Sequence, residues 1–327
     1  MHFNQPMKSK SICLFLILSI VLLTKCGNYT KNETLTLVAE NTIVNSVIDS
    51  MNSLAVGNGH FIFSTDITGL QTFPDFYSGG IPLITRSDLS SPVGNLQGGN
   101  SYSYNLGIVG LRILKKNGIE ISINDIEAPV QSLNMSTGEI ESRFRIEDTP
   151  VLLKTVCHSD YDMISVKIIS DLIRKKQLSI RIDFSDSVSA LPFASDIYSR
   201  RNTTEVISDT NNLAIFERNR NNNKYRVMIW LNDAHLINIS QHIYYLEPDR
   251  SDSTYSFSCQ FLNNPENGRV QNFAETEAAS RRSWEKFWTT TVIKDYRKIK
   301  GAQGKQVTAD LIRSLYYNRL HSFFNEK

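Results

Sequence analysis

The sequence is poor in cysteine and has almost no net charge. Four cysteines in 327 residues (Cys13, Cys26, Cys157 and Cys259) are too few for a disulfide framework, and none of their spacings matches a zinc-ligand pair. We therefore expect neither a metal nor another cofactor. A total of 35 Lys and Arg against 33 Asp and Glu leaves a formal net charge of +2, which is too small to attract nucleic acid.

Long apolar runs are equally scarce. The most apolar run, Ser11 to Leu23, has 13 residues and follows Lys8 and Lys10. This is the pattern of a secretory signal, whereas a bilayer span needs about 20 apolar residues. The next residues, Leu23-Thr24-Lys25-Cys26, resemble the lipobox of bacterial lipoproteins. We expect residues 1–25 to be a lipoprotein-type signal peptide, and the lipid on Cys26 to anchor an exported protein in the bacterial cell envelope. The alternative is a plain signal or short anchor in which Cys26 is incidental.

The sequence does contain enough apolar side chains for a sizeable core. Apolar residues make up 41% of it, with 16 Phe and 13 Tyr, which excludes a disordered chain. Between about residues 35 and 262, apolar and polar residues alternate with a period of two, which indicates strands. The principal predicted strands are residues 108–114, 119–123, 139–146, 150–157, 163–170, 177–184, 213–217, 225–232, 242–246 and 254–261. Such a series predicts a large antiparallel β-sandwich over residues 26–262.

The pattern changes to a helical one after residue 262. A polar segment with Pro265 and Gly268 precedes a predicted helix over residues 270–289, which places Trp284, Phe287 and Trp288 on one face. We assign residues 263–307 to a linker that contains this aromatic helix, and expect a second helix to begin at Thr308. The aromatic face either packs on the sandwich of the same chain or awaits a second domain.

Five ordered segments resemble the N-terminal β-sandwich of glycoside hydrolase family 65-like proteins, which belong to the six-hairpin glycosidase type. The segments are Ser53-Leu54-Ala55-Val56-Gly57-Asn58-Gly59-His60-Phe61 followed by Thr68-Gly69-Leu70-Gln71-Thr72-Phe73, Ser136-Thr137-Gly138-Glu139-Ile140-Glu141-Ser142-Arg143-Phe144, Thr155-Val156-Cys157-His158-Ser159-Asp160 and Trp284-Glu285-Lys286-Phe287-Trp288. The resemblance implies a mutarotase-like supersandwich followed by linker helices and a catalytic (α/α)6 barrel. It also implies inverting hydrolysis or phosphorolysis of α-glucosides.

Two departures from that family bear on function. A barrel of twelve helices, at about 11 to 12 residues each, does not fit into the sequence after residue 270. We therefore expect residues 308–327 to be the start of a truncated barrel, whose remainder is lost or supplied in trans. In addition, residues 88–93 (Asp-Leu-Ser-Ser-Pro-Val) replace a Trp-rich stretch expected from the family.

Several residues are candidates for chemistry. Glu139 and Glu141 share a face of a predicted strand and offer the carboxylate pair that glycoside hydrolysis needs. Cys157 and His158 are adjacent on a strand and point to opposite faces, so they do not form a nucleophile and base. Gly57 and Gly59 are interpreted as architectural, because glycine has no side-chain chemistry.

Aromatic residues near the N-terminus suggest a binding surface instead. Phe73, Phe76 and Tyr77 lie in a loop-like segment, and exposed rings stack on sugar faces, with Arg86 as a polar neighbour. The competing interpretation is that these rings close the sandwich edge or dock on a barrel.

These observations predict a carbohydrate-binding or structural module, which has no catalytic residues of its own and whose partner is an α-glucoside or an oligosaccharide. The alternatives are a self-sufficient β-sandwich glycosidase that uses Glu139 and Glu141, and a surface glycan-binding lipoprotein. For the truncated form we expect an exposed apolar patch around Trp284 and Trp288.

Overall fold

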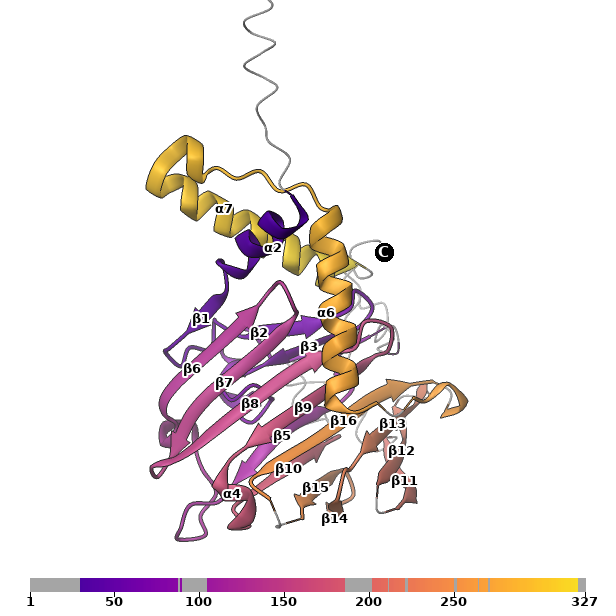
Figure 1. Ribbon diagram of the computed structural model, residues 1–327. Coiled ribbons are helices and arrows are strands. Elements are labelled where there is room, and N and C mark those ends of the chain that lie inside the picture. The colour runs from indigo at the N-terminus through magenta and orange to yellow at the C-terminus, as the bar shows by residue number, and fades with distance from the viewer. Residues whose placement is uncertain are drawn as a thin grey trace, which may run out of the picture.

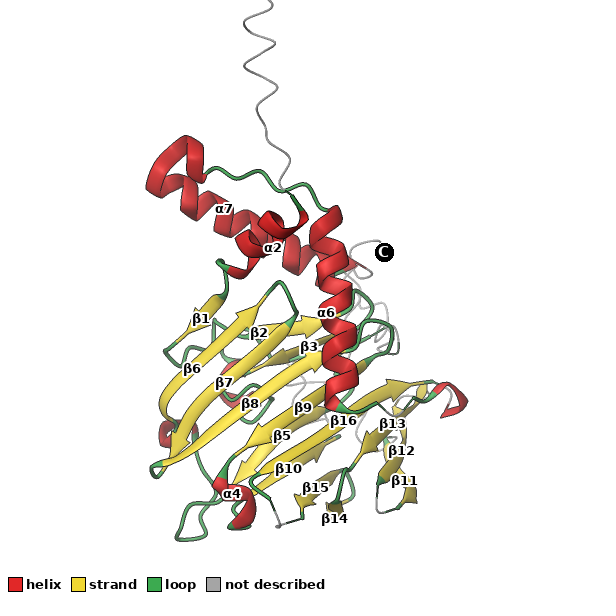
Figure 2. Ribbon diagram, in the orientation of Figure 1, coloured by secondary structure: helices red, strands yellow, loops and turns green. Residues whose placement is uncertain are grey.

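The computed structural model describes residues 30–87, 89, 105–185, 202–210, 212–220, 223–249, 252–263, 265–269 and 271–322. The signal peptide, Cys26 and most of the segment that replaces the Trp-rich stretch lie outside the described residues. Within these ranges the protein is mainly β, with 16 strands in three antiparallel sheets and five α-helices (Figure 2). The predicted β-sandwich followed by helices is confirmed.

The largest sheet has nine strands and forms one face of the sandwich (Figure 1). In spatial order these are β1 (Ile43–Asn45), β6 (Glu127–Asn134), β7 (Glu139–Ile146), β8 (Thr149–Cys157), β9 (Met163–Ile169), β16 (Thr254–Leu262), β13 (Asn223–Trp230), β12 (Leu213–Arg220) and β11 (Thr203–Asp209). The alternating burial along β7 and β8 is the two-residue period read from the sequence. One side of these strands therefore faces the core.

Two smaller sheets cover the inner face of the large one. The first contains β14 (Ala234–Ser240), β15 (Ile243–Pro248), β10 (Leu178–Asp183) and β5 (Ile108–Ile113), and the second contains β2 (Leu54–Gly57), β3 (Ile62–Thr65) and β4 (Thr85–Arg86). Their side chains join those of the large sheet in one apolar core, which includes Phe63, Leu153 and Ile180. Every residue of β2 and β3 is buried, because these strands have the large sheet on one side and helical structure on the other.

Five helices surround this core. They are α2 (Lys31–Ala39), α3 (Pro74–Ser78), α4 (Asp171–Arg174), α6 (Phe273–Thr290) and α7 (Arg297–Leu320), with 3-10 turns at Ile123–Asp125 and Pro265–Asn267. In Figure 1, α6 crosses the outer face of the large sheet, and α7 lies above β2 and β3. No helix among the described residues combines the length and apolarity that a membrane span requires.

Two local predictions are wrong. The segment predicted as a strand at residues 119–123 forms only an isolated bridge, Leu114 to Glu120, because the Asp125 carboxylate accepts hydrogen bonds from the Ser122 amide and hydroxyl and bends the chain into a 3-10 turn. The last helix starts at Arg297 rather than Thr308. Lysine, arginine and glutamine favour helices although they are polar, so a segment with little apolar periodicity is helical here.

The helix α7 is bent near its start. The Tyr296 amide, just before the helix, donates to the Thr308 hydroxyl at 3.0 Å. In a straight helix these residues would be about 18 Å apart. A Cβ built on Gly304 would lie 2.1 Å from the Tyr296 carbonyl oxygen, so glycine is needed where the two segments meet. The bend, visible in Figure 1, directs the second part of α7 along β2 and β3.

Candidate functional site

The position of α7 depends on one apolar row of its side chains. Ile312, Tyr316 and Leu320 are fully buried and recur every four residues, so they form one face. The Tyr316 hydroxyl donates to the Ala55 carbonyl at 3.1 Å. A Cβ on Gly57 would lie 3.1 Å from Leu320, so the glycine allows the end of α7 to approach β2. These contacts determine which other side chains of α7 face the sheet.

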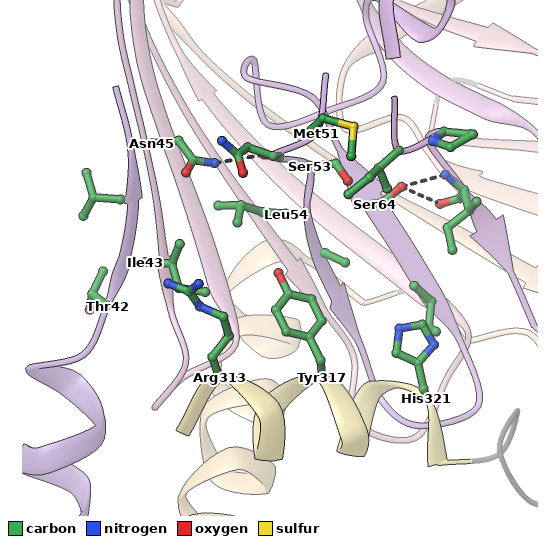
Figure 3. Close-up of a pocket in the computed structure, with 17 residues that line it drawn as sticks. Thr42, Ile43, Asn45, Met51, Ser53, Leu54, Ser64, Arg313, Tyr317 and His321 are labelled. Carbon is green, nitrogen blue, oxygen red and sulfur yellow. Dashed lines mark hydrogen bonds between the residues drawn. The ribbon is translucent and has the colours of Figure 1, made fainter. Parts of the chain in front are cut away.

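The neighbouring row of α7 faces a cavity of about 500 Å³, which we call the α7 pocket. Arg313, Tyr317 and His321 project into it from the helix, as Figure 3 shows. The opposite wall is formed by β1, β2, β3 and the segments that join them. Its lining residues there include Asn45, Asn52, Ser53, Leu54, Ser64 and Ile84. The pocket therefore combines one aromatic ring, one guanidinium and one imidazole with amides, hydroxyls and apolar groups.

The walls of the pocket are held by hydrogen bonds between segments. The Asn45 side chain donates to the Asn52 carbonyl at 3.0 Å and joins β1 to the segment before β2. The Ser64 hydroxyl accepts from the Ile84 amide at 2.6 Å and joins β3 to the segment before β4. Figure 3 shows both pairs on the strand side. These hydrogen bonds hold the segments of the strand-side wall in place without a ligand.

Burial determines the protonation states of Tyr317 and His321, two titratable side chains that α7 contributes to the pocket. Burial raises the pKa of Tyr317 to about 12, so the hydroxyl remains a hydrogen-bond donor over the physiological range. Burial, together with the positive charge of Arg86, lowers the pKa of His321, which leaves the imidazole neutral at pH 7. The ring of Tyr317 is only partly buried and points across the pocket toward Leu54 (Figure 3). Aromatic faces flanked by donors and acceptors are typical of small-molecule sites.

The residues predicted for carbohydrate binding lie in two places, three of them at α3 and Arg86 on β4. Phe73 is the residue before α3, and Phe76 and Tyr77 lie within it, where their rings meet edge to face at 5.4 Å. Tyr77 is only 1% exposed, which contradicts sugar stacking for this ring and agrees with the alternative of a ring that closes the sandwich edge. Phe76 is 40% exposed. Phe73 is half-buried, with its amide bonded to Asp66. Arg86 lies on β4 and is electrostatically coupled to His321, beside the α7 pocket. Ligand binding at Phe76 stays a prediction.

Trp284, Phe287 and Trp288 lie between the sandwich and α7. Trp284 and Trp288 are 2% and 0% exposed, so the apolar patch expected around them is absent from the surface. Trp284 stacks on Tyr316 at 4.4 Å, and the Arg319 guanidinium lies 4.0 Å above the Trp284 ring. Phe287 is half-buried beside the same guanidinium. The Trp284 indole is covered by Tyr316 and Arg319 of α7 of the same chain. The Trp288 indole is buried beside Trp284 and donates to the Met135 carbonyl. The role of these aromatic side chains toward a further domain stays a prediction.

Glu139 and Glu141 share one face of β7, as predicted, but a lysine lies between them. Lys154 Nζ is 2.8 Å from a Glu139 oxygen and 3.6 Å from a Glu141 oxygen. Burial is the largest cause of the raised pKa of Glu139; Lys154 opposes this effect and Glu277 on α6 adds to it. An ammonium group therefore occupies the space where a scissile bond would have to lie between the two carboxylates. This geometry is that of an ion-pair network.

The segments that carry the family resemblance contact one another. The Asn58 side chain donates to the carbonyls of His158 and Tyr161, at 3.2 and 3.1 Å. Gly59 has a φ of +100°, which is the left-handed conformation that favours glycine. Cys157 and His158 are buried, and burial raises the pKa of the Cys157 thiol well above its usual range. These residues have architectural contacts, and the cysteine is not an activated nucleophile.

Within the described ranges, no three His, Cys, Asp or Glu side chains converge in a way that could hold a metal ion. Sequence reasoning did not single out Arg313, Tyr317 and His321. The available signal was their spacing of four residues in a predicted helix, which places them on one face. The sequence does not show that this face is opposite β2 and β3.

No protein-family model matches the sequence, and no curated protein matches it. Solved structures do match. A putative kojibiose phosphorylase from the human microbiome aligns at a TM-score of 0.51 and 12% identity, over 84% of this chain and 41% of that one. A bacterial glucoamylase complexed with acarbose aligns at 0.49 and 9% identity, over 83% and 43%. A family GH92 α-mannosidase from Bacteroides thetaiotaomicron aligns at 0.39 and 11% identity, over 88% and 40%.

The chain thus spans less than half the length of these structures. Its fold is the glycosidase-related β-sandwich, and the likeness to the kojibiose phosphorylase, at 12% identity, shows the fold alone.

Proposed function

We propose that this protein is a carbohydrate-binding β-sandwich module of an exported carbohydrate-active protein, and that the α7 pocket is its binding site. The observation that supports this most is the α7 pocket itself, where the Tyr317 ring lies opposite a wall of amide and hydroxyl groups. Sugars present an apolar ring face together with many hydroxyls, so an aromatic ring flanked by hydrogen-bonding groups is complementary to them.

Binding rather than hydrolysis is assigned to the described residues, because Lys154 bridges the Glu139 and Glu141 carboxylates. A sandwich that binds glycan would serve a helical catalytic domain, located in the same protein or in a separate chain. The kojibiose phosphorylase, with a related sandwich and roughly twice this length, is consistent with such a division of labour. The lipoprotein signal of the sequence would place the module in the bacterial cell envelope.

The test is a calorimetric titration of the mature chain with each member of an oligosaccharide panel. The panel includes neutral α-glucosides and acidic oligosaccharides, and saturable binding of at least one member is expected. We expect Tyr317→Ala to weaken the binding of the best oligosaccharide about two- to thirteenfold, since a ring contact is worth about 0.5–1.5 kcal/mol. Tyr317 is half-buried, so thermal unfolding of each variant is measured alongside.

The matched control is Phe76→Ala, which removes an exposed ring on α3. It should leave binding unchanged if the α7 pocket is the site. A loss of binding in Phe76→Ala, with Tyr317→Ala unaffected, would move the site to α3. Absence of binding to every member of the panel would contradict the proposed function.

A further inference from the structure

Among the described residues that line the α7 pocket, Arg313 has the only charged side chain, and His321 adds a neutral imidazole. None of the 17 lining residues is Asp or Glu, whereas Arg313 and His321 both belong to the lining. Asp49, in the segment between β1 and β2, uses its carboxylate within its own turn, where it accepts hydrogen bonds from the Met51 amide and the Asn52 side chain at 2.8 and 2.9 Å. The described lining residues therefore offer no anion to neutralise a guanidinium.

Arg86 adds a second cation at the same face. It is paired directly opposite Ile62 on β3 and lies two residues after Ile84, so its side chain is on the same side of the sheet as both of these lining residues. Its positive charge also contributes to the lowered pKa of His321 at that end of the pocket. Arg86 Nε is buried without a hydrogen-bond partner.

Neither Arg86 nor Arg313 forms an ion pair with any described residue. Other arginines do: Arg143 binds Glu141 at 2.7 Å, and Arg226 binds Glu217 at 2.9 Å. Arg313 is exposed, whereas Arg86 is half-buried. For Arg86, burial removes part of the hydration of the guanidinium, and no carboxylate among the described residues pairs with it in compensation. Burial accordingly lowers the pKa of Arg86. An anionic ligand would supply the missing counter-charge.

The Arg313 guanidinium and the His321 imidazole are far apart along the helix. Arg313 and His321 are eight residues apart, which corresponds to about 12 Å along the helix axis. The positive charge of Arg86 acts on the His321 end. Tyr317 lies midway between Arg313 and His321 (Figure 3). A monosaccharide carboxylate cannot reach both ends, whereas a short oligosaccharide with an acidic group toward each end can. Its middle unit would then lie against the Tyr317 ring.

We therefore propose that the ligand of the α7 pocket is an acidic oligosaccharide of the uronic-acid class, with carboxylates directed to Arg313 at one end and to Arg86 and His321 at the other. This inference rests on the proposed function, since it specifies the class of sugar bound. Guanidinium groups bind carboxylates through paired, charge-assisted hydrogen bonds, which are stronger than those to neutral hydroxyls.

The experiment compares each acid with its own neutral ester. Oligogalacturonates and oligoglucuronates, and the methyl esters of both, are titrated into the mature chain at low and at high salt. We expect the acid to bind at least about tenfold more tightly than its ester, since hydrogen bonds to charged groups contribute about 1.5–3 kcal/mol. The preference should decrease at high salt. Arg313→Gln should remove most of the preference, so that the affinity for the acid falls close to the affinity for the ester.

The matched control is Arg281→Gln, which removes an exposed arginine from α6, outside the pocket lining. It should leave the acid-to-ester ratio as in the wild type. Two outcomes would overturn the acidic-ligand inference and leave the proposed function intact. One is equal affinity for the acid and its ester. The other is that only neutral α-glucosides bind and that Tyr317→Ala weakens their binding. If neither acidic nor neutral oligosaccharides bind, the inference and the proposed function are both overturned. Arg313 is exposed on the helix, so its substitution does not endanger folding.

Discussion

Asp66 shows how a single buried carboxylate can organise the loop after β3. It is fully buried, and its oxygens accept hydrogen bonds from the Thr68 amide and hydroxyl at 2.8 and 2.6 Å and from the Phe73 amide at 2.7 Å. Burial raises its pKa to about 6, although these donors oppose the shift. Asp66 therefore connects the Thr68–Phe73 segment, one of those that resemble the glycosidase family, to the start of α3.

The raised pKa of Asp66 predicts a pH-dependent stability. The folded state holds the proton more tightly than the unfolded state, so the contribution of this group to the free energy of unfolding is fully present below about pH 4 and is lost as the pH rises through about 6. The loss amounts to roughly 3 kcal/mol. Asp66→Asn should abolish this component, so the stability difference between wild type and variant should narrow from pH 4 to pH 7.

Urea unfolding at several pH values measures this difference. The control, Asp75→Asn, removes an exposed negative charge on neighbouring α3 without touching the buried loop, and it should follow the wild-type curve. Parallel curves for wild type and Asp66→Asn would show that the carboxyl does not titrate in this range.

Among the elements, α6 packs on the turn between β6 and β7, and this contact joins two separate segments of the sequence. The Trp288 indole donates to the Met135 carbonyl at 2.7 Å, and the Ser280 hydroxyl donates to the Thr137 carbonyl at 2.9 Å. Gly138, in the same turn, has a φ of +68° and faces Trp284. The turn and the aromatic helix therefore form one packed unit.

This packing predicts that a methyl group at residue 138 is poorly tolerated. A Cβ on Gly138 would lie 2.1 Å from Trp284 Nε1, so the helix or the turn must move. We expect Gly138→Ala to lower the free energy of unfolding by more than about 2 kcal/mol, from backbone strain and overpacking together. The control is Gly118→Ala, which has a similar φ of +80° but nothing within 4 Å. It should cost about 1 kcal/mol, from backbone strain alone. Equal losses in the two variants would show that contact with Trp284 is not limiting.

The two C-terminal helices differ in how far the sequence predicts them. The apolar period predicts α6 with a start at residue 270, within three residues of its actual start at Phe273. The capping box of Asn272 and Glu275 determines that actual start. The start of α7 is not predicted, because no side-chain cap precedes Arg297 and the first turns have little apolar periodicity. Helix propensity and the contact between Gly304 and Tyr296 determine its actual start and bend.

For the whole molecule, the prediction of an exported lipoprotein concerns residues outside the structure. If Cys26 is lipidated, cells grown with labelled palmitate should incorporate the label into this protein, and the protein should fractionate with membranes. Cys26→Ser should lose both the label and most of the membrane association. An unlabelled but exported wild-type protein would favour the plain-signal interpretation. Cys157→Ser is a suitable control because Cys157 is buried within the sandwich.

The strands and the fold class follow from the sequence because a two-residue period is a local property: β7 extends over Glu139–Ile146, as the alternation predicts. The prediction that Glu139 and Glu141 share a face also follows from local sequence, because the two residues are two positions apart on one strand. The burial of Tyr77, the lysine between the two glutamates and the α7 pocket depend on contacts between residues far apart in the chain. Tyr317 faces Leu54 only because Tyr316 and Leu320 dock on β2. Such contacts leave no periodic signal, and so the tertiary structure alone determines where a ligand could bind.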